Sequence, residues 1–267
     1  MAADTTLGVS GSIGGTGDLV KTGTGTLHLA GNNAYGDTIV REGGLIGNSE
    51  SISVNIVNDG EVAFFQEEDG SLAGDIAGSG TMGKFGFGTL TLDWTIDAGG
   101  LVSASDRFAG DVTIGVRASL IFDQASSGTY AGVLSGSGSF TKDGSGEVLL
   151  TGSGFLGTTN VSAGALRVGQ GEGNGALGGD LNVQSGATLG GSGTVGSGAG
   201  SVVAVASGGT LSRGNSMACS PSMAISSWRL DRALPSRLIR RERIAIWCIP
   251  RWMAARWRIS ARAVPMI

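Results

Sequence analysis

Residues 132–150 read GVLSGSGSFTKDGSGEVLL, and this stretch decides the fold because its pattern returns twice more. Residues 11–29 read GSIGGTGDLVKTGTGTLHL, and residues 74–92 read GDIAGSGTMGKFGFGTLTL. All three copies share the frame G-x-x-x-G-[ST]-G-x-x-x-K-x-G-x-G-x-Ψ-x-Ψ, where Ψ is an apolar residue. So many shared positions indicate a repeat protein rather than a chance excess of glycine.

Shorter spacings lie around the repeats. Val40 and Val161 are 121 residues apart, which is the offset between the first and third copies, so the register persists beyond the frame. Val161, Val183 and Val205 recur every 22 residues, each followed three residues later by glycine. A recurrence near 20 residues corresponds to about one coil of a solenoid. A further match at an offset of 58 pairs Phe64, Gln66 and Gly70 with Phe122, Gln124 and Gly128.

The local pattern is that of short β-strands. Apolar and polar residues alternate in 26–29 (TLHL) and 181–183 (LNV), between runs of Gly, Asn and Ser. Leu and Val are expected to point inward and Thr and Ser outward, while stacked coils pair each strand with the next about 4.8 Å away. These features predict an all-β parallel solenoid of roughly ten coils over about residues 11–216. The repeat lysines are expected to lie on an outer strand or turn: Lys21, Lys84 and Lys142.

Composition divides the chain near Ser216. All 50 glycines precede Met217, and residues 1–216 carry 8 Lys and Arg against 20 Asp and Glu. Residues 217–267 carry 10 Arg against two acidic residues, together with all four Pro, both Cys and four of the five Trp. We interpret this irregular Arg/Trp-rich tail as read out of frame and not as a domain. The alternative is a genuine basic appendage that binds lipid surfaces or nucleic acid.

Few residues indicate a catalytic or ligand-binding site. His28 is the only histidine and lies on the outward alternation, so it is interpreted as a surface residue. Residues 78–84 fit G-x-x-x-x-G-K, but Phe85 replaces the Ser or Thr that would bind Mg²⁺, so no nucleotide site is predicted. The acidic run 67–69 could hold a cation or supply an acid and a base, although a solvated loop is the favoured interpretation.

One weak carbohydrate-contact candidate remains. Asp93 and Asp97 flank Trp94, and an aromatic ring beside carboxylates can stack on a sugar. No catalytic residue, cofactor or metal ligand is predicted, and calcium is not expected.

Residues 15–38, GTGDLVKTGTGTLHLAGNNAYGDT, and residues 136–159 resemble the autotransporter-associated β-strand repeat. Residues 175–216 resemble the run that follows such repeats in autotransporter passengers. The resemblance implies a right-handed parallel β-helix, exported and threaded through its own C-terminal outer-membrane barrel. Arg213 stands where the family usually has Pro, and neither a signal peptide nor a barrel is expected within these 267 residues. Secretion and anchoring are therefore expected of a parent protein.

The resemblance implies a structural or adhesive passenger segment, at the bacterial surface, in the outer membrane or secreted, with no catalysis. Its expected partners are surface molecules of host or neighbouring cells, with self-association as a further possibility. The β-helix is expected to bind no nucleic acid, and to meet a membrane only through a barrel of the parent.

Two alternatives stay open. A β-helical polysaccharide-active enzyme would need Asp93, Asp97, Arg107 and Arg117 in one groove. The chain could also be a non-functional remnant of a frameshifted autotransporter gene.

The interpretation of the tail predicts the DNA that encodes it. Translation of codons 205–267 and the bases beyond them in all three frames is expected to show Gly-rich repeats resuming in a shifted frame, followed by an outer-membrane barrel. Sequencing of this region checks the prediction. If no shifted frame continues the repeats, the tail is genuine, and membrane or nucleic-acid binding becomes its activity to test.

Overall fold

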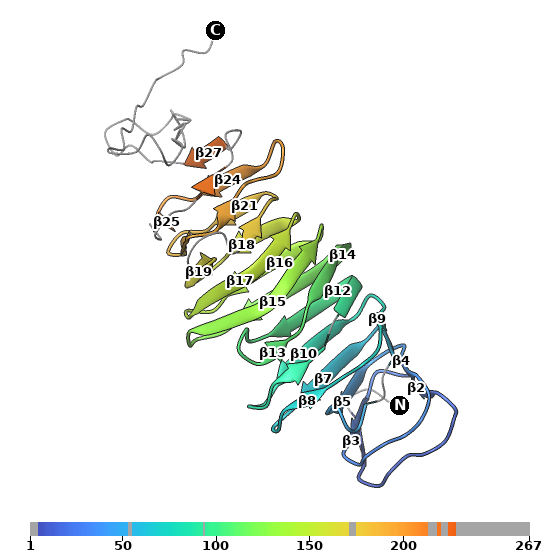
Figure 1. Cartoon of the computed structure of the whole chain (residues 1–267). Helices are drawn as coiled ribbons and strands as arrows, with labels where there is room; N and C mark the ends of the chain where they lie inside the picture. The colour runs from blue at the N-terminus through green and yellow to red at the C-terminus, as the bar shows by residue number, and fades with distance from the viewer. Residues whose placement is uncertain are drawn as a thin grey trace, which may run out of the picture.

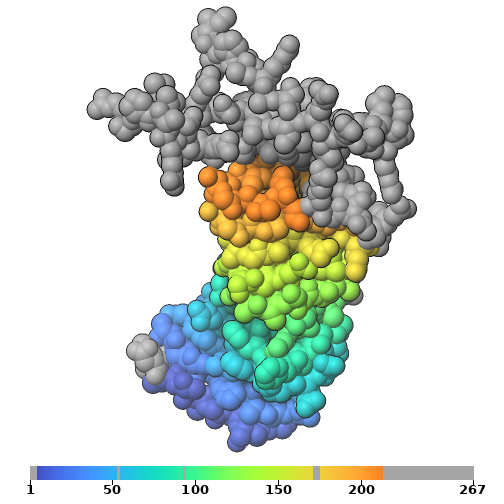
Figure 2. Space-filling view, turned by 90° about the vertical axis from the view of Figure 1, so that its left-hand side faces the viewer, coloured from blue at the N-terminus to red at the C-terminus, as the bar shows by residue number. Residues whose placement is uncertain are grey.

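Short parallel strands stack into a rod in this computed structural model (Figures 1 and 2). The structure describes residues 5–52, 55–92, 94–170 and 175–212, and the backbone of 218–219 and 224–227. These residues form no helix, and every strand pairing among them is parallel. The predicted tail, 217–267, lies outside the described residues apart from those two backbone segments, so the predicted boundary at Ser216 stays a prediction.

The strands line up in three columns that run along the rod. Column 1 is the longest and is paired without interruption from its first strand to its last. Its members are β1 (Thr6–Val9), β3 (Thr26–Leu29), β5 (Gly44–Gly47), β7 (Glu61–Phe65), β10 (Thr81–Phe85), the second halves of β12 (Trp94–Ser103) and β14 (Val112–Asp123), β16 (Ser139–Asp143), β18 (Thr158–Val161), β21 (Leu181–Val183), β24 (Val202–Val205) and β27 (Ala224–Ser227).

Columns 2 and 3 complete each coil. Column 2 contains β2 (Leu19–Lys21), β4 (Thr38–Val40), β6 (Ile56–Asn58), β9 (Ile76–Ala77), the first halves of β12 and β14, the second halves of β15 (Gly128–Gly136) and β17 (Glu147–Phe155), β20 (Ala176–Leu177), β23 (Thr194–Val195) and β26 (Ala218–Cys219). Column 3 contains β8 (Gly70–Ser71), β11 (Leu90–Thr91), β13 (Phe108–Ala109), the first halves of β15 and β17, β19 (Ala165–Val168), β22 (Thr188–Gly191) and β25 (Thr210–Leu211).

The paired positions give the length of a coil. Gly44 pairs with Glu61, 17 residues further on, whereas Val161 pairs with Val183, 22 residues further on. Val183 in turn pairs with Val205. The predicted all-β solenoid of about ten coils is confirmed, and the valine period of 22 is the coil length of its C-terminal part.

The core fills the inside of the coils because every second strand residue points inward. In β3 the side chains of Leu27 and Leu29 are buried, whereas His28 between them is exposed, as predicted. Aromatic rings continue the core along the axis through contacts at centroid distances of 5.2 to 6.1 Å. Burial of each such ring contributes roughly 1.5–3 kcal/mol. The contacting rings are Trp94, Phe108, Tyr130, Phe122 and Phe140.

The corners depend on the glycines of the repeat frame. Gly23, Gly86 and Gly144 follow the repeat lysine by two residues and have φ angles of 75°, 81° and 72°. These angles lie in the left-handed region, which glycine adopts without steric cost. The shared frame K-x-G therefore encodes one type of corner.

The three copies occupy different corners of the rod. Lys21 lies in β2 of column 2, so its turn joins columns 2 and 1. Lys84 in β10 and Lys142 in β16 both lie in column 1, where β12 and β14 are the two strands between β10 and β16. The turns that follow these two lysines join columns 1 and 3. Lys84 and Lys142 are therefore three coils apart in the same column, whereas Lys21 is displaced by one column. One strand–turn–strand motif can serve either corner because both have the same local geometry.

Close stacking at a corner is expected to make Gly146 intolerant of a side chain. An added Cβ would collide with the Ser126 carbonyl of the coil below. The substitution Gly146→Ala should lower the free energy of unfolding by about 1–3 kcal/mol, the range for overpacking, measured as a shift of the urea midpoint in far-UV circular dichroism.

The matched control for this prediction is Gly154→Ala in β17. A Cβ at Gly154 would meet no atom within 4 Å. The free energy of unfolding of Gly154→Ala, measured in the same way, should therefore stay within about 0.5 kcal/mol of the parent value. Equal midpoints for the two variants would contradict the steric account of the corner.

Candidate functional site

The residues of the carbohydrate-contact candidate are separated by burial. Asp93 lies outside the described residues. Trp94 is only 3% exposed, and its ring packs edge-to-face against Phe108 at 5.6 Å. Asp97 is exposed on the outer side of β12. The Trp94 ring therefore offers no face to a sugar, because it belongs to the core.

The acidic run forms an exposed loop at the corner between columns 1 and 3. Glu67, Glu68 and Asp69 are all exposed, and Asp69 Oδ1 accepts a hydrogen bond from the Thr89 backbone N–H of the next coil. Within the described part of the chain, no group of three His, Cys, Asp or Glu side chains is placed to hold a metal ion.

Carboxylates and amides at other corners make the same kind of bond between coils. The Asp37 N–H donates to Asp18, and the Asp75 N–H donates to Asn55. Hydrogen bonds from the backbone and side chain of Ser79 lower the pKa of Asp59. The contribution of Asp59 to folding stability is therefore fully present above its ordinary pKa of 3.8. It is lost as the pH falls through the lower pKa of the folded state.

The repeat lysines are buried, so the prediction that they lie on an outer strand or turn is wrong. Lys21, Lys84 and Lys142 are 3%, 6% and 0% exposed. Each points to the same side as the apolar residue two positions before it, for example Phe140 before Lys142. The alternation of the strand therefore indicated that the lysines point inward. The prediction was wrong because it assumed that a charged side chain must lie in solvent.

Each buried ammonium binds the carbonyl oxygens of its own turn. Lys142 Nζ donates to the carbonyls of Asp143 and Gly144, and also to Ala163 on the next coil at 3.3 Å. Lys84 Nζ donates only to carbonyls of its own turn among the contacts described, at 2.6 and 3.2 Å. The K-x-G frame therefore builds a corner whose inward carbonyls have a donor, and Lys84 is not placed to cradle a phosphate.

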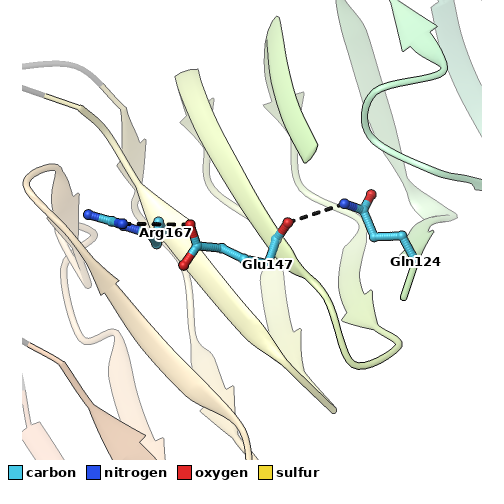
Figure 3. A network of polar contacts seen from close by, with 3 residues as sticks. All are labelled: Gln124, Glu147 and Arg167. Atoms are coloured by element: carbon cyan, nitrogen blue, oxygen red, sulfur yellow. Dashed lines mark hydrogen bonds and ion pairs between the residues drawn. The ribbon is translucent and has the colours of Figure 1, made fainter. Parts of the chain in front are cut away.

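Two buried glutamines carry further hydrogen bonds between coils. Gln124 Oε1 accepts from the Ser105 N–H at 2.7 Å, and its Nε2 donates to the Ser126 carbonyl. The same Nε2 donates to the Glu147 carbonyl, as Figure 3 shows. Glu147 also forms an exposed ion pair with Arg167 at 3.6 Å, which is worth at most about 1 kcal/mol. The offset of 58 in the sequence pointed to this role, because Gln66 makes equivalent bonds three coils earlier.

The residues proposed for an enzyme do not share a groove among the described residues. Asp97 and Arg117 lie near the corner between columns 2 and 1, on neighbouring coils. Arg107 lies at the corner between columns 1 and 3, where Nη1 donates to the Gly86 carbonyl. The described part of the chain therefore does not meet the condition set for a catalytic groove.

Three phenylalanines form an unusual part of the outer surface. Phe65 and Phe85 are each 49% exposed and stack on each other at 5.1 Å, while Phe87 is 79% exposed. The Arg107 guanidinium lies over the Phe87 ring, 4.6 Å from its centre. We name Phe65, Phe85, Phe87 and Arg107 the phenylalanine corner. The other five phenylalanines are buried: Phe64, Phe108, Phe122, Phe140 and Phe155.

Comparison with known proteins agrees with the repeat frame. Residues 19–46 and 140–168 match the family model of the passenger-associated-transport-repeat. The adhesin BmaC autotransporter of Brucella suis biovar 1 (strain 1330) is 37% identical over 168 residues. That match covers 61% of this chain but only 4% of the length of the relative. No solved structure matches with significance.

Among the residues that the structure describes, no helix has the length and apolar character needed to span a membrane.

Removal of a buried lysine is expected to destabilise the corner that it holds. In Lys142→Met, the carbonyls of Gly144 and Ala163 lose the Nζ donor, whereas the Asp143 carbonyl keeps the Gln124 backbone N–H at 3.4 Å. The expected loss is about 2–6 kcal/mol, because unsatisfied buried acceptors cost roughly 1–3 kcal/mol each. Lys84→Met should cost less, since Lys84 contacts no carbonyl of the next coil among its described bonds. Urea midpoints measure the loss of stability in both variants. An unchanged midpoint for Lys142→Met would contradict the role of Lys142 in stabilising its corner.

The same variant is expected to change the pH dependence of stability. Burial lowers the pKa of Lys142 below its ordinary value of 10.5, while Asp143 and Asp123 act in the opposite direction. Between the folded pKa and 10.5 the unfolded chain binds more protons, so this lysine makes stability rise with pH. Urea midpoints across that window should rise less steeply in Lys142→Met, and an identical slope would contradict the assignment.

Proposed function

Because the chain carries repeats of the autotransporter passenger type, we propose that it is a non-catalytic adhesive segment of a longer protein at the bacterial surface. The observation that carries the proposal is the unbroken pairing of column 1 from β1 to β27. Such a ladder makes an extended rod that can grow by adding coils. The partners are surface molecules of host or neighbouring cells.

The arrangement of side chains supports a binding role better than a catalytic one. The buried lysines Lys21, Lys84 and Lys142 are engaged with backbone carbonyls, so they are not available as bases or as ligands for a substrate. The outward residues form a long surface of polar and scattered apolar side chains that a partner can contact over many coils. An adhesin needs this kind of surface and requires no reacting groups.

Adhesion can be measured with the whole chain coupled to latex beads. Beads that carry the folded chain are expected to attach to cultured epithelial cells or to a second bacterium at least several-fold more than albumin-coated beads. Beads that carry the heat-denatured chain serve as the matched control for nonspecific stickiness. Equal attachment of folded and denatured chains would contradict the proposal.

A parallel assay separates adhesion from the enzymatic alternative. The chain is incubated with a panel of polysaccharides, and new reducing ends or unsaturated products are measured. We expect none above the buffer blank. Release of either product in proportion to the chain concentration would replace the adhesive proposal by a polysaccharide-active enzyme.

A further inference from the structure

The repeat frame shows that the phenylalanine corner is not required by the fold. The two outward positions of the K-x-G-x-G turn hold Thr22 and Thr24 in the first copy, and both are exposed. The third copy has Asp143 and Ser145 at these positions, again exposed. The second copy places Phe85 and Phe87 there. Since the same turn forms with polar residues, the exposed rings have another cause, and exposed apolar patches mark interaction sites.

The charges around the corner indicate the kind of partner. Glu67, Glu68 and Asp69 are exposed on the loop that follows Phe65, and Asp106 is exposed beside Arg107. Four exposed carboxylates therefore lie on the loops next to the exposed phenylalanines. A second copy of the same surface would bring like charges together, which disfavours self-association through this corner.

A hollow lies on the column 3 side of the corner. Its volume is about 380 Å³, and its walls include Thr89, Ser105, Asp106 and Thr129. Thr89 follows Phe87 by two residues and Asp106 precedes Arg107 in the sequence, whereas Phe65, Phe85, Phe87 and Arg107 themselves do not line the hollow. The carboxylate of Asp106 gives its wall a negative charge. The hollow is large enough for one long side chain.

Arg107 already shows how a cation meets this surface. Its guanidinium covers one face of the Phe87 ring and also donates to the Gly86 carbonyl. Phe87 remains 79% exposed with Arg107 in place, so most of its side chain is accessible to a partner. Cation–π contacts contribute about 0.5–2 kcal/mol, depending on desolvation.

We propose that the phenylalanine corner docks a basic, partly apolar peptide segment of a partner protein, with apolar side chains on the exposed phenylalanines and a Lys or Arg beside the carboxylates of Glu67 and Asp106. The inference rests on the proposed adhesive function and names its partner class. A flat sugar suits the site less, because Phe65 and Phe85 stack on each other and the surrounding carboxylates contribute most to the binding of a cation.

The test uses the full chain and a fluorescein-labelled octapeptide of alternating Arg and Leu, with binding measured by fluorescence anisotropy. The main variant is Phe85→Thr with Phe87→Thr, which gives the second turn the outward residues of the first copy. Its affinity for the peptide should fall by about tenfold or more, since aromatic anchors dominate such interfaces. Glu67→Gln with Glu68→Gln should weaken binding about threefold to tenfold and reduce its salt dependence.

Two controls keep the result specific. Val116→Thr removes another exposed apolar side chain, 77% exposed on β14 outside the corner, and should leave the affinity unchanged. An octapeptide with Glu in place of Arg should not bind. Equal affinity of the parent and the Phe85→Thr, Phe87→Thr chain would overturn the proposal. Binding of neutral glycans that requires both phenylalanines, without peptide binding, would also overturn it and assign the corner to sugars.

The bead assay separates this inference from the proposed function. If parent and double-variant beads attach equally to cells and the peptide does not bind, adhesion stands and the docking site fails. If no beads attach but the peptide binds the parent alone, the docking site stands and the adhesive function fails.

Discussion

Backbone hydrogen bonding between successive coils is the constraint on which the rest of the structure depends. A strand of three to five residues cannot bury a face alone, and its N–H and C=O groups need partners above and below. Column 1 supplies them from β1 to β27. Because neighbouring strands lie about 4.8 Å apart, the backbone at each corner must approach the coil below closely. Glycines such as Gly146 satisfy this requirement, since a side chain there would strike a carbonyl.

The corners create a second requirement, which buried polar side chains meet. A tight turn directs carbonyl oxygens inward, and several of them, such as that of Gly144, accept no backbone hydrogen bond among those described. Lys142 and Lys21 supply donors to these oxygens and also bind the next coil. Gln124 plays a similar part for three coils at once. A charged amine in the core is costly without partners, so its place in the frame reflects the carbonyls that surround it.

The outward positions are free to vary once the inner residues and corners are set. In the same turn, one copy of the repeat shows Thr22 and another shows Phe85. Variation at such positions changes the surface without changing the ladder. An extended rod of this kind can therefore carry separate contact sites on different coils, as proposed for the phenylalanine corner.

The sequence alone determined the parallel solenoid, the approximate coil length and the inward side of apolar strand residues such as Leu27 and Leu29, because these follow from local alternation and from glycine spacing. The valine period of 22 is a direct record of strand pairing, and the match of Gln66 with Gln124 reflects equivalent hydrogen bonds three coils apart. Only the tertiary structure decided which corner each copy occupies and what the buried lysines contact. It also placed Trp94 in the core beside Phe108. These features depend on atoms of neighbouring coils about 20 residues away, and the local pattern is the same whichever corner or partner they meet.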